Sequence, residues 1–294
     1  MHPAFKLIAI GASVLLSNSI HAQTLQSWMS PEVKRAWDQG YKGQKVTIHV
    51  VDDFRSGSRF YGNLGTGTLL KRHGEWTHLE ASLLAPSATM KSIDFTSNSA
   101  VMLARGLNVV NLSYGMFAAD GYSSSQIRWD KQESSIISFA SKGSAVIAKA
   151  AGNDAVAVGT ANSAGHVDYL NRALVGKQSA IFVGALERNG TVTSPASLSW
   201  YSNYAGNDPA VQRNFLVVGV EGHKTNLYGT SFAAPVVSAY GAIVGSKFKS
   251  ATPTQITNQL LNTARTDTIR NYKQAVHGRG EASIARALAP VSIR

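Results

Sequence analysis

Short β-rich segments alternate with helical segments along most of this chain, and this alternation limits the fold more than any other feature. The predicted strands cover residues 45–51, 88–95, 107–113, 144–150, 180–185 and 215–219. The predicted helices cover residues 30–37, 76–84, 99–105, 130–141, 236–244 and 252–264. Strands that alternate with helices form a parallel sheet with helices on both faces. We therefore predict a single doubly wound α/β domain over residues 23–294.

The composition excludes several classes of protein. The chain has 294 residues, of which 44% are hydrophobic and 15% charged, as in a globular protein with a large core. Because it contains no cysteine, disulfide scaffolds, cysteine proteases and thiolate metal sites are excluded. The net charge is +11, but the Lys and Arg residues are scattered. We therefore expect a basic solvated surface and no nucleic-acid partner.

The first 22 residues have the pattern of a secretory signal peptide. Lys6 gives a positive start, residues 7–16 are apolar, and Ala22 ends a plausible cleavage site. The apolar run is too short to span a bilayer, and no later segment is long enough to do so. We predict that residues 1–22 are removed and that the mature protein is secreted or periplasmic, with no membrane span.

Four polar residues stand at predicted strand or helix ends, which is where parallel sheets bind their ligands. Asp52 and Asn153 follow predicted strands, whereas His73 and Ser231 precede helical segments. Free N–H groups at the start of the apolar helix after Ser231 favour developing negative charge. Serine acyl transfer needs a hydroxyl, a base, a group that orients the base, and donors for the oxyanion. The order Asp, His, Ser along the chain is one known arrangement of these groups.

Several segments resemble the subtilisin family (S8) of serine peptidases. Gly229-Thr-Ser-Phe-Ala-Ala-Pro235 resembles the nucleophile motif of that family, and Ala150-Ala-Gly-Asn153 resembles its oxyanion motif. Asn111-Leu-Ser-Tyr-Gly115 resembles its substrate strand, and Gly43 to Asp52 resembles its strand into the aspartate. The resemblance covers essentially the whole chain after the signal segment and implies a subtilisin-like fold.

The resemblance also implies a role for each site residue. Ser231 would be the nucleophile, His73 the general base and acid, and Asp52 the residue that orients His73. The side-chain amide of Asn153 and the backbone N–H of Ser231 would form the oxyanion hole. The segment Ser113, Tyr114 and Gly115 would bind an extended protein or peptide substrate as an added strand. These roles describe an exported serine endopeptidase.

Two assignments have neighbouring alternatives in the sequence. Asp53 competes with Asp52, although Asp52 shares a strand face with Ile48 and Val50 and matches the family spacing. The histidine motif of the family usually reads His-Gly-Thr-His-Val, but here it reads His73-Gly-Glu-Trp-Thr-His78. Glu75 and Trp76 could therefore reshape the cleft, or His78 could be the functional histidine.

Two departures from the family pattern concern folding and metals. Only about 20 residues separate the signal segment from the turn at Gly43, so we expect no N-terminal pro-domain. The protein would then fold unaided or with a separate inhibitor or chaperone. The stretch before Ala85-Pro86 is too short for the insertion that binds calcium tightly in many relatives. We therefore predict no strong calcium site there, no metal site and no cofactor.

Two other functions compete with the peptidase reading. The first is an esterase of the α/β-hydrolase class, with Ser231 as nucleophile and with Asp267 and His277 following in that class's order. A nucleophile elbow needs a strand that runs directly into the serine, and none is predicted there. The second is a catalytically impaired, subtilase-like binding protein, which the altered segment after His73 would permit.

Small and apolar residues near the substrate strand favour a hydrophobic substrate residue before the scissile bond.

Overall fold

The structure is a computed structural model that describes residues 24–293. The predicted signal peptide, residues 1–22, lies outside the described residues. No helix among the described residues is long and apolar enough to cross a membrane.

Six parallel strands form the central sheet in the order β10-β9-β7-β5-β1-β4. They are β1 (Val46–Asp52), β4 (Thr89–Asp94), β5 (Leu107–Leu112), β7 (Val146–Ala150), β9 (Ala180–Leu186) and β10 (Phe215–Gly219). From β1 the chain crosses to β4 on one side and then returns to β5 on the other, so the sheet is doubly wound. β7, β9 and β10 are buried along their whole length, which explains why these segments are nearly continuous apolar runs.

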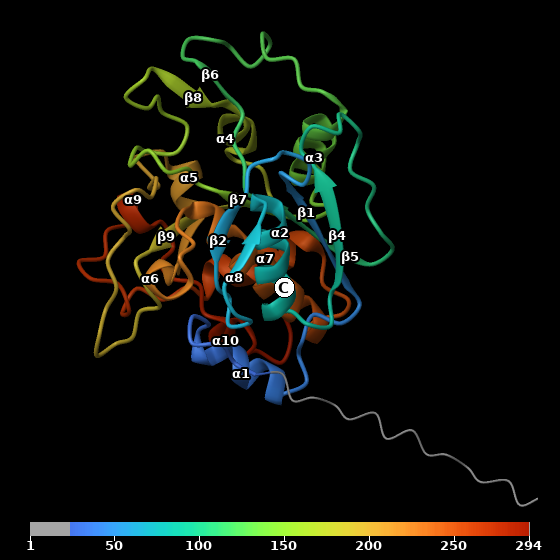
Figure 1. The fold of residues 1–294 in the computed structure, drawn as a ribbon, viewed down its shortest axis with the longest axis vertical. Helices are drawn as coiled ribbons and strands as arrows, with labels where there is room; N and C mark the ends of the chain where they lie inside the picture. Colours follow the sequence, from blue (N-terminus) through green and yellow to red (C-terminus); the bar gives the residue numbers. More distant parts are fainter. Residues whose placement is uncertain (1–23, 294) are drawn as a thin grey trace, which may run out of the picture.

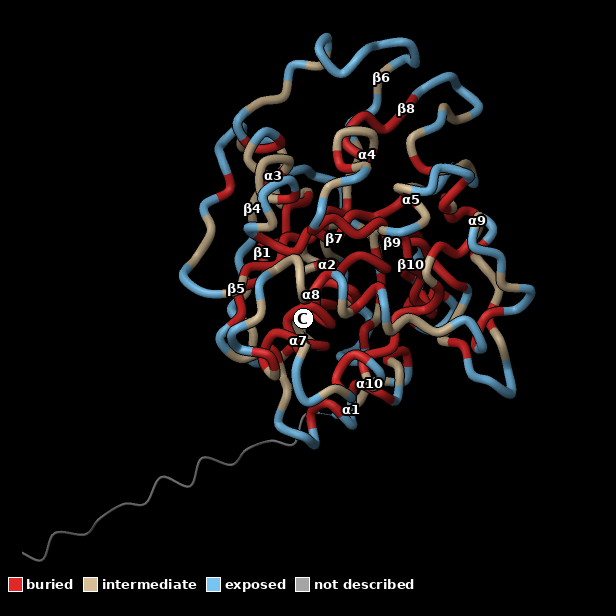
Figure 2. The backbone as a smooth tube through the Cα atoms, turned by 180° about the vertical axis from the view of Figure 1, so that it is seen from behind, coloured by how far each residue is buried: buried red, intermediate tan, exposed pale blue. Residues whose placement is uncertain are grey.

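Helices cover both faces of the sheet, as Figure 1 shows. One face packs against α7 (Ala234–Lys247), α2 (His73–Leu84), α8 (Pro253–Asn262), α1 (Pro31–Asp38) and α10 (Ile284–Ala287). The other face packs against α3 (Lys131–Lys142), α4 (Tyr169–Leu174) and α5 (Pro209–Arg213). In Figure 2 the strands β1, β5, β7, β9 and β10 form the buried centre with α7, while the edge strand β4 and the loops near β6 and β8 are largely exposed. The predicted doubly wound, subtilisin-like α/β fold is confirmed.

The remaining elements are short. They are the antiparallel pairs β2 (Phe60–Gly62) with β3 (Leu69–Lys71) and β6 (Phe117–Ala119) with β8 (His166–Asp168), the helices α6 (Gly222–Thr225) and α9 (Gln274–His277), and the 3-10 turn η1 (Thr230–Phe232). The sequence predicted only a glycine-rich loop where the β2–β3 hairpin forms. The hairpin matters because it leads directly into His73 at the start of α2.

The helix predicted over residues 99–105 is wrong, because this segment has no helical structure. The side chain of Asn108 explains the difference. Its Oδ1 accepts from the N–H of Ala104, and its Nδ2 donates to the carbonyls of Ala104 and Gly106. An asparagine that binds nearby backbone groups in this way offers them an alternative to helical hydrogen bonds.

Candidate active site

The candidate site lies at the carboxyl ends of β1, β5 and β7, where the chain reverses its winding direction. β1 ends at Asp52, Ser113 follows β5, and Asn153 lies three residues beyond β7. Doubly wound sheets form a crevice at such a switch point. The topology therefore brings together three residues that are far apart in the sequence.

Asp52 is a buried carboxylate that contacts His73. The distance from His73 Nδ1 to Asp52 Oδ1 is 2.6 Å, and Asp52 is only 1% exposed. Oδ1 also accepts from the N–H of Asp53 at 2.7 Å, and Oδ2 accepts from Thr77 Oγ1 at 2.7 Å. Because an ionised carboxylate only accepts hydrogen bonds, His73 carries its proton on Nδ1, which leaves the lone pair of Nε2 free.

Asp53 does not contact His73. Its Oδ1 accepts from the backbone N–H groups of Arg55 at 3.2 Å and Ser56 at 2.8 Å, so it holds the loop after β1. Asp52 and Asp53 point to opposite sides because they alternate along an extended segment. The strand-face argument from the sequence selects the aspartate that lies beside His73.

The unusual residues after His73 do not enter the cleft. Glu75 caps the start of α2, where its Oε2 accepts from the N–H of Arg72 at 2.8 Å and its Oε1 pairs with the Arg72 guanidinium at 3.1 Å. Trp76 is fully buried and donates from Nε1 to the carbonyl of Phe60 at 3.1 Å. The suggestion that the Trp76 side chain reshapes the cleft is therefore wrong, because this side chain is fully buried. Instead, the two side chains fix the start of α2 and the hairpin that leads into it.

His78 lies apart from Asp52. Its Nδ1 is 2.8 Å from Ser92 Oγ on the neighbouring strand β4, and burial lowers its pKa. Of the two candidate histidines, His73 is the one that contacts a buried carboxylate.

Ser231 lies in the 3-10 turn η1, immediately before α7. Its hydroxyl donates to the carbonyl of Ser113 at 3.1 Å, and the hydroxyl of Ser113 donates to the carbonyl of Ser231 at 2.9 Å. Within residues 24–293, no hydrogen bond joins Ser231 to His73, but the next side chain, Phe232, has its ring centre 5.5 Å from that of His73. The turn that carries Ser231 therefore packs beside His73.

Asn153 is oriented by the residue before Ser231. Its Oδ1 accepts from the N–H of Thr230 at 2.8 Å and from Thr230 Oγ1 at 3.0 Å. The amide Nδ2 has no hydrogen-bond partner among the described residues and can donate to a ligand. Gly229 has a φ of 120°, and a Cβ there would lie 3.3 Å from Nδ2. A side chain at Gly229 would therefore strain the backbone and crowd this amide.

A cavity of about 200 Å³ lies beside Ser231 and Asn153. Ser113, Tyr114 and Gly115 line one side of it, and the segment after β7 lines the other. Lys149 and Asp168 also line the cavity, and sequence reasoning missed both. The signal for Lys149 was a single charge in the otherwise apolar strand 144–150. Thr77 and Thr230 were missed as well, because they act only through the side chains that they orient.

His277 and Asp267 lie away from Ser231. His277 is buried and contacts the backbone of Lys273 through Nδ1. The following residue, Gly278, packs against the backbone of Phe215 at the amino end of β10. His277 therefore lies near the amino ends of the strands, whereas the cleft lies at their carboxyl ends. Asp267 pairs with Arg286 at 3.2 Å on the surface. The fold therefore does not assemble an esterase triad from these residues.

No cluster of three or more His, Cys, Asp or Glu side chains that could hold a metal occurs within residues 24–293.

A family model described as "Subtilase family" matches residues 80–280, which is more than half of the chain. The chain belongs to the subtilase family. The matched residues include Asn153 and Ser231, but Asp52 and His73 precede them. As a subtilase, the protein is a serine-type peptidase and acts on peptide substrates.

Solved structures with similar folds are also proteases. The prenylagaramide maturation protease PagA is 19% identical, with a TM-score of 0.57, and the match covers 88% of this chain and 98% of PagA. MycP1 from the ESX-1 type VII secretion system is 19% identical with a TM-score of 0.56, covering 87% of this chain and 83% of MycP1. A protease from Pseudoalteromonas arctica is 18% identical with a TM-score of 0.53, covering 88% and 93%. A comparison with curated protein sequences found no match.

Proposed function

We propose that this subtilase is a serine endopeptidase in which Asp52, His73 and Ser231 act as the catalytic triad. The observation that carries the proposal is the contact of 2.6 Å between the buried carboxylate of Asp52 and Nδ1 of His73, whose ring packs against Phe232, the residue after Ser231. This contact orients the imidazole with Nε2 available as a base. It also stabilises the imidazolium that forms when Nε2 takes a proton.

In the proposed reaction, Ser231 Oγ attacks the carbonyl carbon of the scissile peptide bond while His73 Nε2 takes the hydroxyl proton. The tetrahedral intermediate collapses as His73 returns this proton to the leaving amine. Water then attacks the acyl ester on Ser231, with His73 again acting as base and then as acid. Asp52 stays ionised throughout, supported by its hydrogen bonds from Asp53 and Thr77.

The hydroxyl of Ser231 has to turn before it can react. It donates to the carbonyl of Ser113 and not to His73, whose ring packs against Phe232. A rotation about χ1 moves a serine hydroxyl between staggered positions at small energetic cost. Catalytic hydrogen bonds are often poorly aligned before the substrate binds. We propose that a substrate strand beside residues 113–115 accompanies this rotation.

The oxyanion would be held by the amide Nδ2 of Asn153 and the backbone N–H of Ser231. The orientation of Asn153 supports this role, because Thr230 occupies its Oδ1 and leaves the donor end free. Donors that are fixed before the reaction need no reorganisation when negative charge develops, and this makes them effective in transition-state stabilisation.

Labelling with a fluorophosphonate probe tests the triad directly. The wild-type protein should be labelled on Ser231 and should hydrolyse casein, and Ser231→Ala should lose both activities. His73→Ala should lose most of its labelling rate, whereas His78→Ala serves as the matched control and should keep it. Absence of labelling in the folded wild-type protein would refute the proposal. Equal losses in the two histidine variants would refute the role of His73.

The position of the Ser231 hydroxyl also supports a second candidate, a subtilase that binds peptides with impaired catalysis. If the bond to Ser113 persists when substrate binds, the hydroxyl does not reach the base. This candidate would be favoured over the first if the wild-type protein bound peptides in a calorimetric titration but neither reacted with the fluorophosphonate probe nor hydrolysed the peptides.

We further propose that the peptidase is exported and needs no calcium for stability. The sequence of residues 1–22 supports export, and N-terminal sequencing of the secreted protein should begin at Gln23. The short connection from α2, which ends at Leu84, to β4, which begins at Thr89, supports the second point. The melting temperature should be the same in EDTA and in calcium, and a large rise with calcium would contradict it.

A further inference from the structure

A buried ion pair lines the cavity beside Ser231. Lys149 Nζ lies 2.9 Å from Asp168 Oδ2, and the two side chains are 1% and 6% exposed. Nζ also donates to the carbonyl of Ala150 at 2.7 Å. Both residues line the same cavity as Ser231 and Asn153. A charged pair in this position is unusual. Lys149 lies on the same face of β7 as Ile147, and Ile147 packs into an apolar cluster.

Asp168 is held in place without help from Lys149. Its Oδ1 accepts from the backbone N–H groups of Met116 and Leu170, each at 3.0 Å. The other oxygen, Oδ2, lies beside Gly115, which lines the cavity. A Cβ on Gly115 would lie only 2.8 Å from this oxygen. Lys149 is the side chain that neutralises this oxygen. Asp168 would therefore remain a fixed carboxylate beside the cavity if the charge of Lys149 were removed.

We propose that Lys149 is a specificity-determining residue, which neutralises Asp168 and thereby selects substrates with an uncharged side chain before the scissile bond. This inference rests on the proposed function, since it places that substrate side chain in the cavity. Because Ser231 and Asn153 both line this cavity, a substrate carbonyl bound by these two residues would direct the side chain of the same substrate residue into it. From the sequence alone, we expected a hydrophobic substrate residue before the scissile bond. With the ion pair in the cavity, we expect uncharged polar residues to be accepted there as well.

Both signs of charge are disfavoured for the same reason. A lysine or arginine side chain of the substrate would reach Asp168 only beside the ammonium of Lys149, and a glutamate would reach Lys149 only beside Asp168. Such like-charge contacts in a buried site reject a ligand. Neutral side chains of medium size, such as Leu, Met or Gln, avoid both contacts and suit a cavity of about 200 Å³.

Two further acidic groups lie near this cavity. Asp154 is at its mouth, where it is exposed to water and accepts a hydrogen bond from Asn162 at 3.3 Å. Glu133 accepts from the hydroxyl of Tyr114 at 2.7 Å, behind the wall that Tyr114 forms. Water screens the first carboxylate and Tyr114 covers the second, so neither replaces Asp168 as the charge that a substrate side chain would meet.

The test is a set of peptides that differ only in the residue before the scissile bond, which is Leu, Gln, Lys or Glu. The ratio of kcat/KM values is measured for the wild type, Lys149→Met, Asp168→Asn and the double variant, with active sites counted by fluorophosphonate labelling. Wild type should prefer Leu and Gln over Lys and Glu by at least about tenfold. Lys149→Met should raise the Lys-to-Leu ratio by at least about tenfold, because the charge of Asp168 becomes available.

The other variants keep the test decisive if Lys149→Met folds poorly. Asp168→Asn should raise the Glu-to-Leu ratio instead, and the neutral double variant should return to the uncharged preference. Asp267→Asn, which removes an exposed carboxylate away from Ser231, is the matched control and should leave all ratios nearly unchanged. Fully labelled variants with unchanged ratios would overturn the inference while leaving the proposed function intact. A wild type that is not labelled at all would remove the proposed function, and the inference with it.

Discussion

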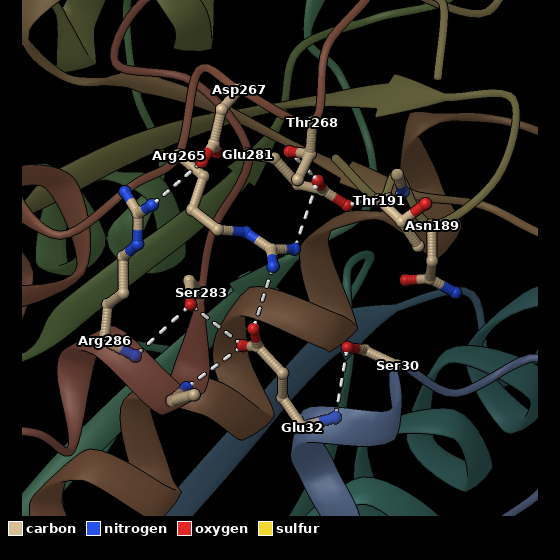
Figure 3. A network of polar contacts seen from close by, with 12 residues as sticks. Ser30, Glu32, Asn189, Thr191, Arg265, Asp267, Thr268, Glu281, Ser283 and Arg286 are labelled. Carbon is tan, nitrogen blue, oxygen red and sulfur yellow. Dashed lines mark hydrogen bonds and ion pairs between the residues drawn. The ribbon is translucent and has the colours of Figure 1, made fainter. Parts of the chain in front are cut away.

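Two groups of buried charges in this subtilase differ in what their positions allow. The first is the pair Lys149–Asp168 beside Ser231. The second is the terminal network, in which Arg265 lies between Glu32 of α1 and Glu281, at 2.9 Å and 3.3 Å (Figure 3). Both are buried ion clusters, but none of the residues of the terminal network lines the cavity beside Ser231. Burial of charge alone therefore does not indicate function.

The hydrogen bonds of the terminal network involve other segments of the chain than those of the cleft pair. Glu32 Oε2 accepts from Ser283 Oγ at 2.9 Å and from the N–H of Ala285 at 3.0 Å. Glu281 accepts from the N–H of Gly190 at 3.0 Å and from the hydroxyl of Thr268. The bonds from Ser283, Ala285 and Gly190 join α1 or the loop at Gly190 to the C-terminal segment. This arrangement fastens the first described helix to the end of the fold, whereas the cleft pair shapes a cavity.

Removal of Arg265 should have the largest effect on stability. Arg265→Met leaves the carboxylate of Glu281 buried without its cation and leaves Glu32 only the longer contact of 3.8 Å with Arg35, so the free energy of unfolding should fall by about 3–5 kcal/mol at neutral pH. Burial raises the pKa of Glu281, although its hydrogen bonds and Arg265 oppose this. The loss should therefore be smaller in acid, where this carboxyl becomes neutral. Urea unfolding at pH 5 and pH 7 measures both effects.

Two further measurements separate this role from a role in the site. The matched control is Arg286→Met, which removes an exposed pair with Asp267 and should cost less than about 1 kcal/mol. The hydrolysis rate per labelled molecule of Arg265→Met should equal that of the wild type. If it shifts substrate preference as Lys149→Met does, the contrast between the two clusters is wrong.

The sequence predicted the fold better than it predicted the side chains that support the site. The strands β7 and β10 were recognisable because parallel strands buried on both faces are apolar throughout. The spacing of Asp52 on its strand also selected the correct neighbour of His73. These features follow from local pattern, which a single sequence contains.

Other features depend on contacts between distant segments, which no local pattern contains. Asp168 reaches Lys149 through the pairing of two short strands, β6 and β8, that the sequence did not predict. Trp76 was suspected in the cleft because of its neighbours in sequence, yet the hairpin covers it. The helix predicted over residues 99–105 failed because the side chain of Asn108 takes its backbone groups.

Loss of the Asn153 amide should reduce turnover strongly while stability changes little, the reverse of Arg265→Met. Asn153→Ala should lower kcat by about 10²–10³, which is the range known for loss of an oxyanion-hole donor in subtilisin itself. Asn153→Asp keeps the oxygen that accepts from Thr230 and should lose at least as much activity. The measurement is peptide turnover per labelled site, combined with thermal melting. Normal turnover in Asn153→Asp would exclude an oxyanion role for this side chain.

Substitution of Thr77 should lower both stability and turnover. Each effect should be smaller than the corresponding effect of Arg265→Met or Asn153→Ala. Thr77→Val removes the hydroxyl that donates to Asp52 Oδ2 at 2.7 Å, so a buried carboxylate loses one hydrogen bond. The free energy of unfolding should fall by about 1–3 kcal/mol. The value of kcat should fall roughly tenfold, because His73 is held less firmly, while KM stays nearly constant. Thr77→Ser retains the hydroxyl and should restore kcat, and failure of this rescue would assign the effect to packing.

Substitution of Glu80 should have the smallest effect on the free energy of unfolding at neutral pH. This residue extends the comparison of buried charges to a carboxyl group that no cation neutralises within residues 24–293. It lies on α2 with His73, is 5% exposed, and its Oε2 has no hydrogen-bond partner among the described residues. Burial raises its pKa well above the usual value. A raised native pKa contributes stability that is fully present below the unfolded pKa and is lost as pH rises through the native pKa. The wild type should therefore lose stability with rising pH, and Glu80→Gln should avoid that loss.

The difference in unfolding free energy between Glu80→Gln and the wild type isolates this residue. Burial also raises the pKa of Glu133, to about 7, but that carboxyl is present in both proteins and cancels in the difference. The difference should stay within about 1 kcal/mol at pH 5. It should then grow in favour of the variant as the pH is raised toward 9. A difference that is constant from pH 5 to pH 9 would mean that Glu80 does not titrate inside the folded protein. In that case the Glu80 carboxyl would already be ionised in the folded protein at pH 5, despite its burial.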